Sequence, residues 1–250
     1  MAVVSVMLAN NEVGTVQPLA EVAEVVRHRA PGALVDTDAV AAASFLDVAS
    51  LSWGADLVSV SAHKFGGPKG VGALVVRAGS RLAPQLHGGS QERGMRPGTP
   101  GVAGIVGMAV ALELATRTRT EAAAQVERLR DRLADGLTST VPGLIETGVP
   151  RDAAGRSDRS RKVVSNCHVC VDGVDQEELL VLLDDAGVCA SGGSSCASGA
   201  LEPSHVLLAM GLSTREARSA VRFSLGRTTT GADVDRVLEV MPKAVEQLRS

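Results

Sequence analysis

A lysine that follows a short apolar run is the residue of this sequence best suited to covalent chemistry. Lys64 lies four residues after a predicted strand at residues 56–60 and is flanked by Ser61, His63 and several glycines. A lysine amine can lose its proton when it is desolvated, whereas arginine cannot, and the free amine attacks carbonyl carbons. This set suits a Schiff base with pyridoxal phosphate. From this segment alone, a surface lysine in a glycine-rich turn is an equally good interpretation.

An acidic residue ends the preceding predicted strand. Residues 33–35 are apolar and lead to Asp38. A pyridoxal cofactor needs a carboxylate against its ring nitrogen, because the protonated ring is an electron sink. Asp38 and Lys64 close successive strands of an α/β pattern, where ligands collect at the strand ends. The structural alternative for Asp38 is the N-cap of a helix that begins at Ala39.

A third segment carries a cysteine among small residues. Residues 191–199 are Ser, Gly, Ala and Cys only, with Cys196 near the centre. Such a run predicts a flexible loop that exposes its thiol, as a nucleophile that moves between partners requires. The alternative is a surface linker with an incidental cysteine.

Taken together, these segments resemble the NifS- and IscS-like cysteine desulfurases, which are pyridoxal-phosphate enzymes of the class V aminotransferase group. The resemblance runs along essentially the whole chain. Its matching blocks, in the family's order and near its spacing, are residues 10–14, Asp38, residues 61–64, residues 87–99, residues 194–204 and residues 221–226.

The resemblance implies a role for each residue that would hold pyridoxal 5'-phosphate. Lys64 would be the Schiff-base lysine and the acid/base that moves protons on the substrate carbon. Asp38 would be the partner of the pyridinium nitrogen, and Ser61 and His63 would be phosphate ligands. Thr99 matches a position that reaches the phosphate of the neighbouring subunit, which implies a homodimer. The alternative for His63 is a satisfied core histidine.

The resemblance also implies how the substrate, L-cysteine, would be handled. Asn11 and Arg222 would bind its carboxylate, for which a guanidinium fork is well suited. Cys196 would attack the substrate sulfur and carry it as a persulfide, with alanine released, before a sulfur-acceptor or Fe–S scaffold protein takes it. The alternatives are a turn-forming role for Asn11 and a buried structural ion pair for Arg222.

The chain also departs from the family pattern. Relatives have a large additional amino-terminal part, which would supply the first strands of the sheet, a phosphate loop at a helix N-terminus and a histidine that stacks on the cofactor ring. Ala41 occupies the place of a glutamine that bonds the cofactor's phenolic oxygen, a loss of about 1 kcal/mol. A carboxy-terminal tail used for scaffold docking is expected to be short or absent.

The pattern of elements predicts an α/β fold. The resemblance implies a fold-type I transferase, with an incomplete, mainly parallel sheet domain followed by a smaller α+β domain. Near-continuous apolar strands argue for a sheet covered on both faces. The expected domains are residues 1–115 and 116–250, with the active site between them. Strands are expected at 3–9, 33–35, 56–60, 71–76, 163–171 and 220–224, and helices at 18–29, 100–139, 176–186, 203–210 and 231–249.

Composition excludes several classes of protein. The 250 residues carry a formal net charge of −3, which gives no indication of nucleic-acid or anionic-membrane binding. No apolar run has the length of a membrane span and no secretory signal is recognisable, so we expect a cytoplasmic protein with reduced thiols. The pair Cys167 and Cys170 has metal-like spacing, but residues three apart on a strand face opposite sides and no second pair follows. No metal site is therefore expected.

Three functions remain open from the sequence. The first is a cysteine desulfurase, either alone or completed by a separate amino-terminal piece. The second is a truncated, inactive remnant or a non-catalytic partner, which the missing phosphate loop and Ala41 favour. The third is a related selenocysteine lyase or class V aminotransferase. The thiol of Cys196 argues against plain transamination, which needs no thiol.

Overall fold

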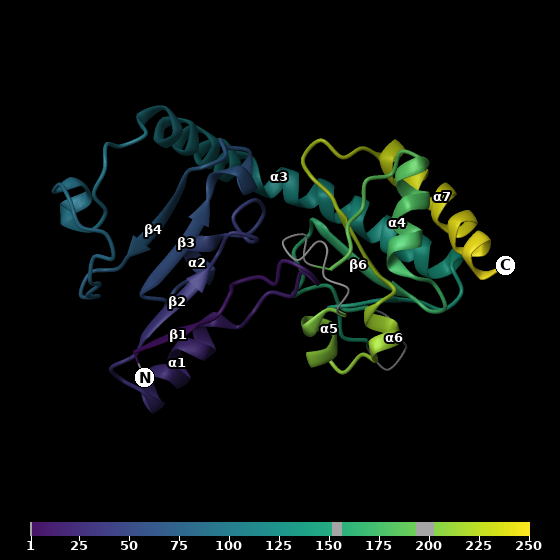
Figure 1. The fold of residues 1–250 in the computed structure, drawn as a ribbon, viewed down its shortest axis with the longest axis horizontal. Coiled ribbons are helices and arrows are strands. Elements are labelled where there is room, and N and C mark those ends of the chain that lie inside the picture. Colours follow the sequence, from purple (N-terminus) through teal and green to yellow (C-terminus); the bar gives the residue numbers. More distant parts are fainter. Residues whose placement is uncertain (1, 152–156, 194–202) are drawn as a thin grey trace. The chain divides into compact units, whose positions relative to one another are not determined.

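The computed structural model describes residues 2–151, 157–193 and 203–250. They form two compact units (Figure 1). Unit 1 consists of Met1–Ala9 and Gln17–Arg119, and unit 2 consists of Asn10–Val16 and Thr120–Ser250. The short segment Asn10–Val16 therefore leaves unit 1 to become part of unit 2, and the chain then returns to unit 1.

Unit 1 contains a four-stranded sheet in the order β1-β2-β3-β4. The first three strands are parallel, and β4 is antiparallel to β3. The strands are β1 (Val3–Ser5), β2 (Leu34–Asp38), β3 (Leu57–Ser61) and β4 (Gly72–Val76). The predicted α/β class and the mainly parallel sheet are confirmed.

The expectation that both faces of the sheet are covered is wrong for β4. Each of its residues is exposed, although its sequence, GALVV, is apolar. The apolar sequence of β4, which predicted burial on both faces, therefore belongs to an exposed edge strand. An apolar edge of this kind is a surface on which another chain can pair or pack.

Helix α1 (Leu19–Arg29) is the longest helix in the part of unit 1 before residue 100. It follows Pro18 and buries Leu19, Ala23 and Val26 on one face. Proline is favoured at this end of a helix because its fixed φ suits the first turn and no backbone N–H is needed there. The remaining helical turns are α2 (Val48–Leu51), η1 (Ala62–Phe65) and η2 (Gln91–Gly94).

One long helix takes part in both units. Helix α3 (Val102–Thr140) has 39 residues, close to the expected 100–139. Its residues up to Arg119 belong to unit 1 and those from Thr120 belong to unit 2. None of the described helices combines the length and the hydropathy that crossing a bilayer would require.

Unit 2 contains a three-stranded antiparallel sheet in the order β5-β6-β7. The strands are β5 (Leu144–Glu146), β6 (Asn166–Val171) and β7 (Ala220–Ser224). The strand expected at 163–171 begins three residues later. The N–H of Val163 donates to the carbonyl of Gly14 at 2.8 Å, so this peptide binds the segment Asn10–Val16 rather than a neighbouring strand.

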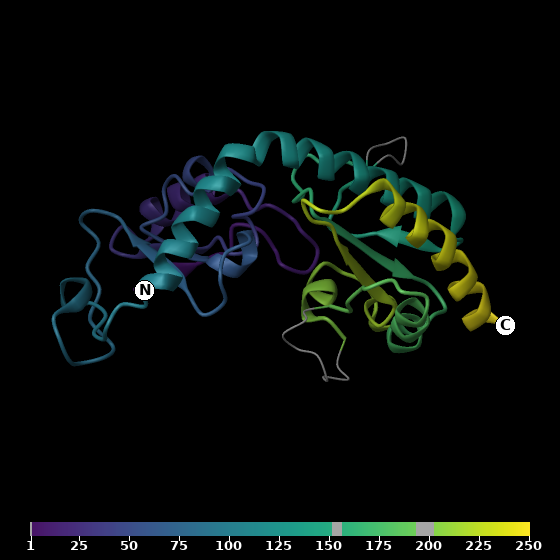
Figure 2. The same cartoon turned by 90° about the horizontal axis from the view of Figure 1, so that it is seen from above.

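Helices flank this sheet, and their ends are defined by capping side chains. Asp175 accepts from two N–H groups at the start of α4, and Thr230 and Asp233 form a capping box at the start of α7. In unit 2, α7 lies along α3 (Figure 2), with Arg132 of α3 paired to Asp235. The helices are α4 (Gln176–Asp185), α5 (His205–Ala209), α6 (Thr214–Ala217) and α7 (Gly231–Arg249).

Candidate active site

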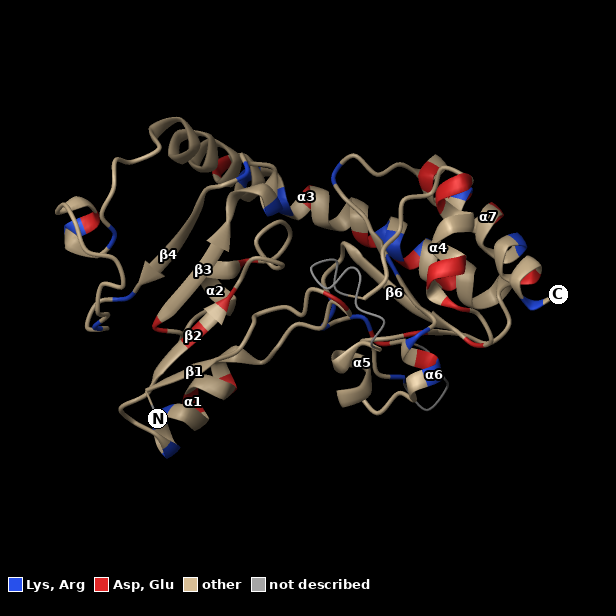
Figure 3. Ribbon diagram, in the orientation of Figure 1, with Lys and Arg blue, Asp and Glu red and all other residues tan. Residues whose placement is uncertain are grey.

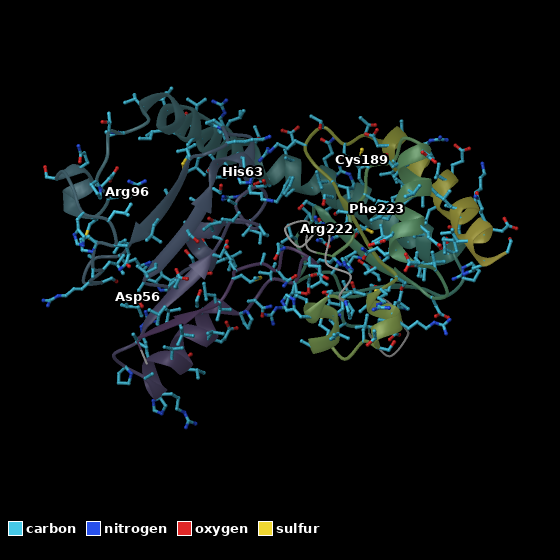
Figure 4. The ribbon with its side chains drawn as sticks, viewed as in Figure 1. Asp56, His63, Arg96, Cys189, Arg222 and Phe223 are labelled. Carbon is cyan, nitrogen blue, oxygen red and sulfur yellow. The ribbon has the colours of Figure 1, made fainter. Side chains whose placement is uncertain are left out.

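In unit 1, the predicted cofactor residues gather where β2 and β3 end. Asp38 is the last residue of β2, and it pairs in register with Ser59 of the parallel strand β3. Ser61 is the last residue of β3, and the turn η1 that follows carries His63 and Lys64. Figure 4 labels His63 at this end of β3. Since β2 and β3 are adjacent and parallel, these side chains come from one edge of the sheet.

Both charged groups at this edge are exposed, and one hydrogen bond anchors each residue, through the side chain of Asp38 and through the backbone of Lys64. One carboxylate oxygen of Asp38, Oδ1, accepts from the N–H of Val40 at 2.8 Å. The residues after Asp38 form turns, so this bond caps a turn. The helix beginning at Ala39, which was the structural alternative for Asp38, is not present. The carbonyl of Lys64 accepts from the hydroxyl of Ser44. The Lys64 Nζ amine has no partner among the described residues, so it is available to a ligand.

The predicted phosphate ligands contact each other. The hydroxyl of Ser61 lies 2.8 Å from Nδ1 of His63, and His63 is exposed, so the interpretation as a core histidine is excluded. Thr99 lies apart in the chain, exposed between η2 and α3. Ala41 lies half-buried in the turn after Asp38.

These groups are the donor set that a phosphorylated pyridine aldehyde requires. An amine can condense with the aldehyde, a carboxylate can pair with the ring nitrogen, and a hydroxyl with an imidazole can bind the phosphate. Lys64, Asp38, Ser61 and His63 supply one group for each of these tasks from two neighbouring strand ends. The residues present therefore fit pyridoxal phosphate.

In unit 2, the segment Asn10–Val16 is held by hydrogen bonds along its length. Within it, Oδ1 of Asn10 accepts from the N–H groups of Glu12 and Val13, each at 2.9 Å. The turn-forming residue is thus Asn10, and Asn11 lies exposed at the tip of the turn. The N–H of Val16 donates to the carbonyl of Arg161 at 2.8 Å, which ties the far end of the segment to the rest of unit 2.

Arg222 joins this tip to the segment that leads to the predicted nucleophile. Its Nη1 donates to the carbonyl of Asn11 at 2.8 Å and to the carbonyl of Gly193 at 3.2 Å. Its backbone also exchanges two hydrogen bonds with Ser191, at 2.7 and 3.1 Å. The structure therefore brings together Asn11 and Arg222, the two predicted ligands of a substrate carboxylate. Figure 4 labels Arg222 on β7.

Cys196, the predicted nucleophile, lies outside the described residues. The chain on its amino-terminal side is described up to Gly193, which accepts from Arg222.

The other described cysteines differ in exposure. Cys167 and Cys170 are buried in β6, and burial raises the pKa of each thiol to about 12. Such thiols are unreactive. Cys189 is exposed. No cluster of metal-ligating side chains occurs in the part of the chain that the structure describes.

Sequence reasoning missed a set of buried charged residues in unit 2. The carboxylate of Glu146 accepts from Arg159 Nε at 2.9 Å and from its Nη2 at 2.7 Å, and Lys162 Nζ lies 3.6 Å away. Glu12 and His168, which come from segments far apart in the sequence, are also buried. Oε1 of Glu12 lies 4.0 Å from Nε2 of His168. No local pattern marks these residues, because their burial depends on segments far apart in the chain.

The comparison with known proteins places this architecture in one family. Residues 1–237 match the family Aminotransferase class-V. The chain is 46% identical over 250 residues to a cysteine desulfurase of Cereibacter sphaeroides, covering 100% of this chain and 61% of the relative. It is 42% identical over 246 residues to the cysteine desulfurase IscS of Clostridium botulinum, covering 98% and 60%.

Solved structures agree with the sequence comparison. A structure described as a NifS-like protein superposes with a TM-score of 0.85 at 35% identity, covering 98% of this chain and 61% of the other. The chain therefore belongs to the class V aminotransferase family, and its fold is that of the NifS-like, fold-type I enzymes. It spans about three fifths of the length of the relatives that it matches.

Proposed function

We propose that this chain carries the chemistry of a pyridoxal-phosphate-dependent cysteine desulfurase, which removes sulfur from L-cysteine and releases L-alanine. The observation that carries the proposal is the placement of Asp38 and Lys64 at the ends of adjacent parallel strands, with Ser61 and His63 beside Lys64. The similarity to curated cysteine desulfurases supports it.

The residues of unit 1 would hold the cofactor. Pyridoxal phosphate, when bound, supplies the electron sink for the α-carbon of the substrate. Lys64 would hold the cofactor covalently and would move the proton at that carbon. Asp38 keeps the ring nitrogen protonated. Ser61 and His63 bind the phosphate, and Thr99 would reach the phosphate of a second subunit.

The residues of the other unit would handle the substrate. Arg222, fixed on the carbonyl of Asn11, binds the substrate carboxylate together with Asn11. The Cys196 thiolate then attacks the substrate sulfur. The new S–S bond forms as the bond between sulfur and the β-carbon breaks, and the electron pair of that bond remains with the β-carbon, which is protonated to give alanine. Cys196 is left as a persulfide for a sulfur-acceptor or Fe–S scaffold protein in the cytoplasm.

A homodimer is part of this proposal, since Thr99 is assigned to the neighbouring site. Exposed apolar residues support it: three valines, Val102, Val106 and Val110, lie one turn apart on α3. In Figure 3 the ribbon of this first part of α3 is mostly tan, so few of its residues are Lys, Arg, Asp or Glu. An exposed apolar stripe of this kind marks an association surface.

Ala41 supports a second candidate, a non-catalytic partner of a desulfurase. Its methyl group cannot replace the hydrogen bond of the family's glutamine to the cofactor, a loss of about 1 kcal/mol. This candidate predicts cofactor binding without sulfur removal, and it is separated from the first by the experiment below.

The experiment follows the cofactor and then the sulfur. The purified chain is incubated with pyridoxal phosphate, and its visible absorbance is compared with that of Lys64→Ala and of Lys69→Ala, an exposed lysine five residues further on. We expect a visible band in the wild type and Lys69→Ala only, and a pyridoxyl mass at Lys64 after borohydride reduction.

The second stage adds L-cysteine and measures alanine release and the persulfide mass. We expect both to be lost in Cys196→Ala and retained in Cys189→Ala, which removes an exposed thiol seven residues earlier in the chain. A band without alanine or persulfide would favour the non-catalytic partner. Equal spectra for the wild type and Lys64→Ala would contradict the cofactor assignment.

A further inference from the structure

A group of buried polar side chains lies beneath the segment Asn10–Val16 in unit 2. Glu12 is 2% exposed, His168 is 0% exposed and Asn166 is 7% exposed. Asn166 and His168 are two residues apart on β6 and therefore face the same side of the sheet. Arg222 of β7 is the register partner of His168, so it faces this side as well. The polar group and Arg222 thus share one face of the sheet.

Three atoms of this group have no hydrogen-bond partner among the described residues. They are Oε1 of Glu12, Nε2 of His168 and Oδ1 of Asn166. A buried polar atom without a partner costs about 1–3 kcal/mol, and native proteins contain few of them. Two of them, Oε1 of Glu12 and Nε2 of His168, lie 4.0 Å apart. The side chains of Glu12 and His168 therefore face each other within this buried group.

In its neutral form, the imidazole of His168 can present a ring N–H to a carboxylate. Burial, together with the nearby cations of Lys162 and Arg222, lowers the pKa of His168 to about 3. The hydroxyl of Thr147 lies 2.5 Å from Nδ1. When this hydroxyl donates to Nδ1, the ring proton is on Nε2, which faces Glu12.

Glu12 lies next to the two carbonyl groups that accept hydrogen bonds from Arg222. Its own carbonyl accepts from Nδ2 of Asn166 at 2.8 Å, and the carbonyl of the preceding residue, Asn11, accepts from Arg222. Its Oε1 lies 3.8 Å from the position of a Cβ on Gly193, whose carbonyl also accepts from Arg222. Both carbonyl groups that orient the guanidinium are therefore next to Glu12, one in sequence and one in space.

We propose that Glu12 is a positioning residue: its buried side chain, held against the imidazole of His168, fixes the Asn11 carbonyl on Arg222 and so aims the guanidinium at the substrate carboxylate. The inference rests on the proposed function, because it assigns Arg222 the carboxylate of the substrate. Glu12 does not touch the substrate, and it acts through the geometry of Arg222.

The test compares two buried carboxylates of unit 2. Glu12→Gln keeps the size of the side chain and removes its charge, and Glu146→Gln makes the same change in a carboxylate that contacts Arg159 and Lys162 instead. In the cofactor-loaded chain we expect Glu12→Gln to raise KM for L-cysteine at least tenfold while kcat changes less than threefold. Glu146→Gln should lower the unfolding midpoint and leave KM unchanged. A KM within twofold of wild type in Glu12→Gln would overturn the proposal.

A second measurement needs neither cofactor nor turnover. Hydrogen exchange of the Arg222 guanidinium, followed by NMR in the ligand-free chain, reports whether its Nη1 is still held by the Asn11 and Gly193 carbonyl groups. We expect exchange at least fivefold faster in Glu12→Gln and unchanged in Glu146→Gln. Unchanged exchange in both variants would overturn the proposal.

The two measurements separate the inference from the function on which it rests. If the wild type releases no alanine from cysteine, the proposed function fails, and the exchange measurement alone decides the role of Glu12. If Glu12→Gln does not fold, Glu12→Asp can be used instead. It keeps the carboxyl group but shortens the side chain by one methylene, which moves the group away from His168. That variant should show the same faster exchange at Arg222, and wild-type exchange in it would overturn the proposal.

Discussion

At the scale of single residues, His168 makes a specific contribution to the pH dependence of stability. Its pKa is about 3 in the folded chain because the ring is buried beside Lys162 and Arg222, and about 6.5 in the unfolded chain. As the pH falls below about 6.5, the unfolded chain binds a proton that the folded chain does not bind. The free energy of unfolding is therefore largest above that pH and decreases below it, by about 1 kcal/mol at pH 5.5.

The measurement is denaturant unfolding of the wild type, His168→Gln and His205→Gln at pH 7.5 and at pH 5.5. The free energy of unfolding should fall between pH 7.5 and pH 5.5 by about 1 kcal/mol less in His168→Gln than in the wild type. His205 is exposed at the start of α5, so His205→Gln should keep the wild-type difference. An identical pH dependence in all three proteins would show that His168 does not remain neutral in the folded state.

The sequence points to some candidate site residues and not to others, for a physical reason. Asp38 and Lys64 could be proposed because Asp38 ends one strand and Lys64 follows the next, and a strand end is visible in the local pattern. Glu12 and His168 could not be found, because a glutamate and a histidine are ordinarily exposed or solvated. Their burial follows from the docking of the segment Asn10–Val16 against β6. Glu12 and Asn166 of these two segments are 154 residues apart, a separation that no local periodicity records.

At the scale of elements, the docking of the segment Asn10–Val16 depends on a close backbone approach at Gly148. Gly148 has φ +71, and a Cβ there would lie 2.5 Å from the carbonyl oxygen of Val13. Gly187 has nearly the same φ, +77, with nothing within 4 Å of its Cβ position. The two glycines therefore differ in steric contact but not in backbone conformation.

We expect Gly187→Ala to lower the free energy of unfolding by about 1–2 kcal/mol, the cost of a side chain at positive φ. Gly148→Ala adds a collision with backbone and should lower it by about 3 kcal/mol or more. Urea unfolding measures both values. Equal losses in the two variants would mean that the chain near Val13 moves away without cost, and that the segment is not held as closely as described.

The elements themselves were predicted with uneven success. Strand β7 and helix α7 have the expected bounds, because a largely apolar run marks β7 and the capping box of Thr230 and Asp233 marks the start of α7. Strand β6 begins later than expected, since Val163 bonds to Gly14 instead of a strand. The exposure of β4 could not be anticipated, because an apolar sequence does not reveal whether a partner covers it.

At the scale of the whole molecule, the chain is organised as two units that do not follow its linear order. The segment Asn10–Val16 belongs to the unit that otherwise begins at Thr120, and α3 contributes residues to both. No composition change in the sequence marks the passage at Asn10. The ligands assigned to the substrate, Asn11 and Arg222, lie in one unit because of this passage.

The exposed stripe on α3 leads to a prediction about assembly. Val102, Val106 and Val110 are 65%, 55% and 60% exposed and lie four residues apart, so they line one face of the helix. Fully burying a valine contributes about 1.5–3 kcal/mol, so a second copy that covers this face would gain substantially from it. We therefore expect the wild type to elute with twice its 25.6 kDa mass at micromolar concentration.

Substituting both Val106→Glu and Val110→Glu should shift the chain to the monomer, because an unpaired charge resists burial at an interface. The control is Val181→Glu, which places the same charge at a valine of α4 that is also 60% exposed. Light scattering after size exclusion at several concentrations measures the three masses. A dimeric double variant would place the interface elsewhere, for example on the exposed strand β4. A monomeric wild type would remove the neighbouring subunit to which Thr99 is assigned, and with it the homodimer from the proposed function.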